Sequence, residues 1–68
     1  GLPHIEVVGN QEFFMEQQRA ILSYSGEEIA INGENLIIRV RGEGLALVSM
    51  TGEALRIKGS ISQVEWVK

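Results

Sequence analysis

Glycine followed by glutamate recurs along the second half of this chain, and these repeated turn residues limit the length of any helix or strand there. The dipeptide begins at positions 26, 33, 42 and 52 of the 68 residues, and each interval holds one short apolar run. Short apolar runs separated by turn residues are typical of consecutive antiparallel β-strands. The spacing therefore predicts an all-β chain.

Four turns or breaks are expected in this half of the chain. Asn32-Gly33 is expected to form a tight two-residue hairpin, because both central residues of a type I′ turn need a positive φ. Gly42-Glu43-Gly44 and Thr51-Gly52-Glu53 are expected to turn the chain twice more, and Gly59 is expected to break the strand that it follows.

Alternation of apolar and polar residues predicts which side chains face the core. The expected inward set is Leu36, Ile38, Val40, Leu55 and Ile57. Residues 45–50 are apolar on both faces, which indicates a strand covered on two sides or by another subunit. In the last run the apolar spacing changes to three, which predicts a β-bulge near Ser62 or Gln63.

Residues 12–25, EFFMEQQRAILSYS, have no clear period. As a helix this segment would place Gln17 and Gln18 in the middle of its apolar stripe, whereas two strands would alternate more regularly. The pattern favours two strands and leaves the helix open. In the strand interpretation Phe14 lies opposite Phe13 and Met15, on a face that a monomer would expose.

Size and charge restrict the possible partners. A chain of 68 residues is expected to form one domain, 1–68, with a thin stability margin. It has no cysteine and one histidine, so self-association is the expected additional source of stability. A net charge of −3 argues against nucleic acid and anionic membrane surfaces as partners. No apolar run is long enough for direct insertion into a membrane.

No group of residues has the pattern of a catalytic site, so neither enzyme activity nor a cofactor is expected. His4 is a single histidine without the further ligands that a metal site needs. The serines lack a G-x-S-x-G context, and the Gly-Glu carboxylates fall on expected turns. The aromatic residues are not interleaved with Lys and Arg, as a base-stacking platform would be. Phe14, Val48 and Met50 are instead candidates for an interface.

The order of these features resembles a known family over essentially the whole chain. Pro3 precedes an alternating strand and the turn Gly9-Asn10, then comes the segment 15–22, MEQQRAIL, and the Gly-Glu strands end in IKGSI at 57–61. This order resembles the YabP/YqfC family of sporulation proteins, and within it the YqfC-like branch.

The most specific motif of that family reads Ile-Glu-Asn-His-Arg-Gly before an apolar pair. Glu16 and Arg19 match it, whereas Gln17, Gln18 and Ala20 depart from it. If the Asn-His-Gly part of the motif binds a partner, this chain has lost or altered that role. Glu16 and Arg19 have two open interpretations: an ion pair that shapes the corner between two strands, or a partner-binding surface.

The resemblance implies a small non-enzymatic protein of the mother cell in an endospore-forming bacterium, linked to late spore formation and encoded beside a membrane protein. We expect an antiparallel β roll or sandwich of about seven or eight short strands whose edges pair with other copies. It would act as an assembly or adaptor module, cytoplasmic or held at the forespore membrane by its partner. The alternative is a small β-barrel that binds a small ligand or an oligonucleotide.

Overall fold

The computed structural model describes residues 4–67, and these residues form β-strands without any helix. The six strands are β1 (Ile5–Val8), β2 (Glu12–Glu16), β3 (Ala20–Tyr24), β4 (Glu28–Asn32), β5 (Ile37–Met50) and β6 (Ala54–Val67). They form one antiparallel sheet in the order β1-β2-β6-β5-β4-β3. The all-β prediction is therefore confirmed. Pro3, the first residue of the family pattern, lies outside the described residues.

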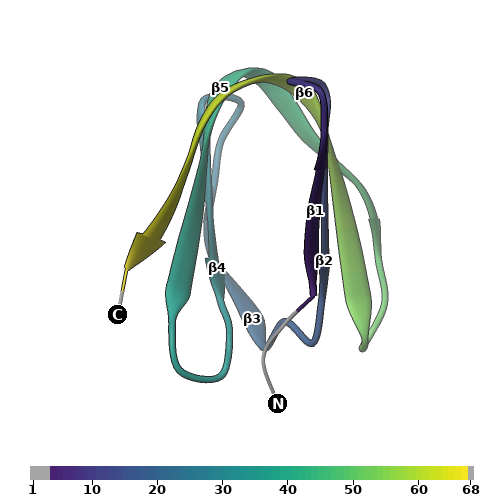
Figure 1. The fold of residues 1–68 in the computed structure, drawn as a ribbon, viewed down its shortest axis with the longest axis vertical. Helices are drawn as coiled ribbons and strands as arrows, with labels where there is room; N and C mark the ends of the chain where they lie inside the picture. Colours follow the sequence, from purple (N-terminus) through teal and green to yellow (C-terminus); the bar gives the residue numbers. More distant parts are fainter. Residues whose placement is uncertain (1–3, 68) are drawn as a thin grey trace.

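The two longest strands, β5 and β6, run through both halves of the sheet. The second half of β5 and the first half of β6 lie beside β2 and β1, whereas the other halves of these strands lie beside β4 and β3. Both strands arch over the top of the molecule in Figure 1, so the two halves of the sheet face one another. The sheet is thus a roll folded from a single layer.

The space between the two halves holds the hydrophobic core. The members of this core are Phe13, Met15, Ile29, Ile31, Ile38, Val40, Leu45, Leu55, Ile57 and Ile61. Burying each large apolar side chain stabilises the fold by about 1.5–3 kcal/mol. Four of the five residues predicted to face inward are fully buried, and the fifth, Leu36, packs against the core while partly buried.

Glycines allow β5 and β6 to bend without ending. A Cβ at Gly42 would lie only 1.9 Å from the backbone oxygen of Ser60, and Gly44 has a φ of +61°. Gly59 has a φ of +149°, and its Cβ would lie 2.8 Å from the oxygen of Gly44. The predictions that residues 42–44 turn the chain and that Gly59 ends a strand are therefore wrong. Two bends replace two turns, which leaves six strands instead of seven or eight.

The hairpin between β4 and β5 is confirmed, but its turn lies further along than predicted. Asn32 remains in the ladder opposite Ile37, and the N–H of Gly33 donates to the oxygen of Leu36 at 2.8 Å. Neither Asn32 nor Gly33 has a positive φ. The type I′ turn predicted at these two residues is therefore wrong, because the ladder continues through Asn32.

Three other local predictions are confirmed. Residues 12–25 form two strands, β2 and β3, and residues 51–53 connect β5 to β6. Arg41 pairs with Gln63 and Gly42 with Ile61, which leaves Ser62 as the extra residue of a β-bulge. The Ser62 hydroxyl donates to the oxygen of Arg41 at 3.1 Å. The bulge keeps both Ile61 and Val64 against the core.

The close approach at Gly42 gives a stability prediction. Gly42→Ala should reduce the free energy of unfolding by about 3 kcal/mol or more, because the new methyl group would collide with the backbone of β6. Gly52→Ala is the control, since a Cβ there has no atom within 4 Å, and it should stay within about 0.5 kcal/mol of the wild type. Urea denaturation followed by circular dichroism measures both, and equal losses would contradict the steric explanation.

Candidate interaction site

The corner between β2 and β3 contacts the tip of the β5–β6 hairpin. Gln17 has a φ of 66°, and its N–H donates to the oxygen of Glu53 at 2.8 Å. Gln18 is buried, and its Nε2 donates to the oxygen of Thr51 at 2.9 Å. The Oε1 of Gln18 is buried without a hydrogen-bond partner. The two glutamines that depart from the family motif therefore attach this corner to residues more than thirty positions away.

Arg19 pairs with Glu34 in the loop between β4 and β5, with 3.3 Å between Nη2 and Oε1. The side chain of Glu16 is exposed, and its backbone N–H donates to the oxygen of His4 at 2.8 Å. The structure thus directs the two motif residues to different neighbours, and the corner is held by Gln17 and Gln18. An exposed ion pair such as Arg19–Glu34 contributes little to stability. The interpretation of Glu16 and Arg19 as a partner-binding surface stays a prediction.

The three candidate interface residues do not form one apolar surface. Val48 and Met50 lie together on β5 and are 49% and 44% exposed. Phe14 is on the outer face of β2, where the guanidinium of Arg56 lies 5.1 Å from its ring centroid. The His4 ring meets Phe14 edge-on at 6.3 Å. Arg56 pairs with Phe14 on one side and Ser49 on the other, so a cation separates Phe14 from the β5 residues.

Sequence reasoning missed two further exposed apolar residues on the neighbouring edge. Leu22 and Tyr24 of β3 are both about half exposed. The Tyr24 hydroxyl accepts a hydrogen bond of 2.8 Å from the N–H of Leu47, which connects β3 to the second half of β5. The sequence signal was the run AILSY at 20–24, a strand without a charged residue.

Ion pairs connect β4, β5 and β6 on the outer face of the half of the sheet that contains β3 and β4. Nε of Arg41 lies 2.8 Å from Oε2 of Glu28, and Glu65 lies 3.7 Å from Arg41 and 3.8 Å from Arg39. The hydrogen bond from Arg41 holds the pKa of the Glu28 carboxyl below its ordinary value. These charges are consistent with a face in contact with solvent.

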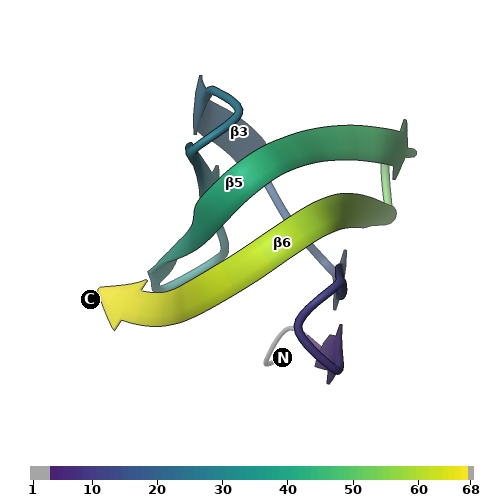
Figure 2. The same cartoon turned by 90° about the horizontal axis from the view of Figure 1, so that it is seen from above.

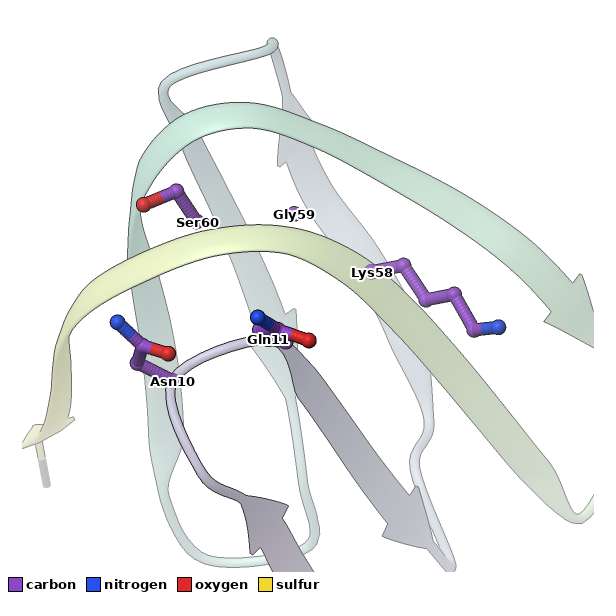
Figure 3. A pocket seen from close by; sticks show the side chains of 5 residues that line it. All are labelled: Asn10, Gln11, Lys58, Gly59 and Ser60. Carbon is purple, nitrogen blue, oxygen red and sulfur yellow. The ribbon is translucent and has the colours of Figure 1, made fainter.

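A hollow lies where β6 bends over the turn between β1 and β2 (Figure 3). It is lined by Asn10, Gln11, Lys58, Gly59 and Ser60. Lys58 is the one cation of this lining, and its Nζ lies 3.9 Å from a carboxylate oxygen of Glu12. The five lining residues include no acid and no imidazole. They therefore provide no acid–base pair for catalysis.

The described residues contain neither a candidate metal cluster nor a membrane-spanning helix. Among residues 4–67, no three His, Asp or Glu side chains lie close enough together to hold a metal ion. Nor does any helix in this part of the chain have the length and apolarity to cross a membrane.

The fold and these surfaces define a small antiparallel β-roll with apolar strand edges. A family model described as the YabP family matches residues 2–68. The chain belongs to the YabP family, and this membership implies a sporulation-related protein. Neither a curated protein nor a solved structure matches the chain significantly.

The corner contact predicts a difference between two adjacent glutamines. Gln18→Ala should reduce the free energy of unfolding by about 1–2 kcal/mol, because it removes a buried side chain and its hydrogen bond to the hairpin tip. Gln17→Ala keeps the backbone bond to Glu53 and should change the free energy by no more than about 0.5 kcal/mol. Chemical denaturation of both variants checks this, and an equal or larger effect at Gln17 would contradict it.

The lowered pKa of Glu28 predicts acid sensitivity. Because the folded state favours the ionised carboxylate, this contribution is present above the ordinary value of 4.5 and is lost as the pH falls through the lowered pKa. Glu28→Gln should therefore reduce stability at neutral pH and flatten its acid dependence. Glu43→Gln, at an exposed carboxylate outside this ion pair, is the control. Thermal melts from pH 7 to about pH 3 measure the effect, and parallel curves for Glu28→Gln and wild type would refute it.

Proposed function

We propose that this protein is a non-enzymatic assembly or adaptor module of late spore formation, of the YqfC-like branch of its family. It acts in the mother cell through contacts with other proteins. One contact is with other copies of itself, and another is with a membrane protein that holds it at the forespore surface.

The observation that carries this proposal is the family membership over residues 2–68 together with apolar side chains on unpaired strand edges. Val48 and Met50 are nearly half exposed on a part of β5 that has β6 as a neighbour on one side only. Exposed apolar groups beside unpaired backbone groups favour association with another protein. A net charge of −3 favours protein partners over nucleic acid or an anionic lipid surface.

The adaptor role predicts capture of a specific membrane protein. The tagged protein, expressed in sporulating cells and purified after mild detergent extraction, should bring down one membrane protein in amounts similar to its own. Arg19→Ala should reduce this capture, because Arg19 matches the family motif, whereas Lys58→Ala, on β6 and outside that motif, is the control. Recovery of the bait without any membrane protein, in wild type and variants alike, would overturn the adaptor role.

The self-association half of the proposal has a separate test. Size-exclusion chromatography with light scattering should give a mass above that of the 7.5 kDa chain at micromolar concentration. A monomer under all conditions would overturn self-association and leave the adaptor role standing.

A further inference from the structure

Four segments of the sheet lack a neighbouring strand on one side. They are β1, β3, residues 45–50 of β5 and residues 62–67 of β6. Every large apolar residue that is exposed among residues 4–67 lies on one of them: Val7, Val8, Leu22, Tyr24, Val48, Met50 and Trp66. The apolar surface is thus concentrated at the edges of the sheet, where no neighbouring strand covers it.

Two of these edges carry no charge. The sequence of β3 is AILSY and that of residues 45–50 is LALVSM, whereas β1 contains Glu6 and residues 62–67 contain Glu65. Figure 2 shows β3 and the end of β5 on the same side of the molecule, opposite β1, and the Tyr24–Leu47 hydrogen bond joins them. We call β3 and residues 45–50 the uncharged side. Natural sheets usually protect an edge with charge, proline or a β-bulge; this side has neither charge nor proline, and each of its two edges has a bulge, at Leu22 and at Val48.

The register shows that the interior reaches solvent on the uncharged side. Tyr24 pairs with Ile29 and Met50 pairs with Leu55, and both of these partners are fully buried. Directly paired residues point to the same face of a sheet, so Tyr24 and Met50 point toward the core side. Both are nevertheless about half exposed. A molecule that covers them would complete the enclosure of the core.

We propose that a second copy of this chain covers the uncharged side, with the two β3 strands antiparallel about a two-fold axis near Leu22. This inference rests on the self-association proposed above and names its surface. A two-fold contact brings the same patch of both copies together. A side chain near the axis then lies beside the same side chain of the other copy. A charged residue there would be repelled by its equivalent, whereas the uncharged residues of β3 avoid this repulsion.

Charges at the two ends of β3 complement one another in this arrangement. Arg19 precedes the strand and Glu27 follows its last residue, Tyr24, by three positions. With the axis near Leu22, an antiparallel pair of β3 strands places Arg19 of each copy opposite Ser25 of the other, two positions from Glu27. Opposite charges across an interface favour association and fix its orientation, whereas the net charge of −3 opposes contacts elsewhere.

The size of this side suits a dimer of modest affinity. The molecule measures 29 × 22 × 20 Å along its principal axes, which limits one side to about 600 Å² and a dimer interface to at most about 1,200 Å² in total. That limit is the lower end of the range for stable specific interfaces.

Two matched substitutions test the location of the contact. Leu22→Glu places two carboxylates at the axis and should raise the dimer dissociation constant at least about a hundredfold. Val8→Glu on the opposite edge should change it less than about threefold. Leu22 and Val8 are similarly exposed, at 52% and 57%, and circular dichroism verifies that both variants fold. Sedimentation equilibrium measures the constants, and equal effects, or none at Leu22, would overturn the proposal.

Charge reversal tests the orientation. Arg19→Glu and Glu27→Arg should each weaken the dimer about tenfold, and the double variant should recover most of the wild-type affinity. Recovery of affinity in the double variant would show that Arg19 acts through Glu27 of the other copy, because the double variant does not restore the Arg19–Glu34 pair within one chain. A double variant no better than either single one would overturn the antiparallel arrangement. A dimer unaffected by Leu22→Glu would refute this surface but not self-association, whereas a monomeric wild type would refute both.

Discussion

The close approach of β5 and β6 at Gly42 is the contact on which the architecture depends. The backbone of Ser60 occupies the space that a side chain at position 42 would need, so the two strands can cross tightly and change direction together. That bend turns one six-stranded layer into two facing halves. A chain of this size buries a smaller fraction of its surface than a larger domain does, and bending strands that both halves share lets a single layer enclose a core.

Much of the fold follows from local patterns in the sequence. Alternation placed Ile38, Val40, Leu55 and Ile57 correctly in the core, and the change of phase after Ile61 located the bulge at Ser62. The glycines at 42–44 were misread because glycine permits both a turn and a bend. Which one occurs depends on whether the next strand pairs with the same neighbour or folds over the core. That choice is a long-range property, absent from any window of ten residues.

The candidate site was predictable to a smaller extent, for a related reason. Exposure of Val48 followed from a strand apolar on both faces, but the separation of Phe14 from it depends on Arg56, a residue of another strand. An ion pair between Arg19 and Glu16 was one of the two interpretations that the sequence left open, whereas the fold brings Glu34 to Arg19. The family resemblance located the corner at Gln17 and Gln18, and the structure supplied the hairpin tip that they contact.

The sharing of β5 and β6 by both halves of the roll also has a consequence for unfolding. Neither half has a complete set of strands of its own, because the paired strands β5 and β6 belong to both halves. Unfolding of either half therefore removes part of β5 and β6 from the other half. A partly unfolded form with one half intact would have few stabilising contacts. The small domain should lose its structure in one cooperative transition.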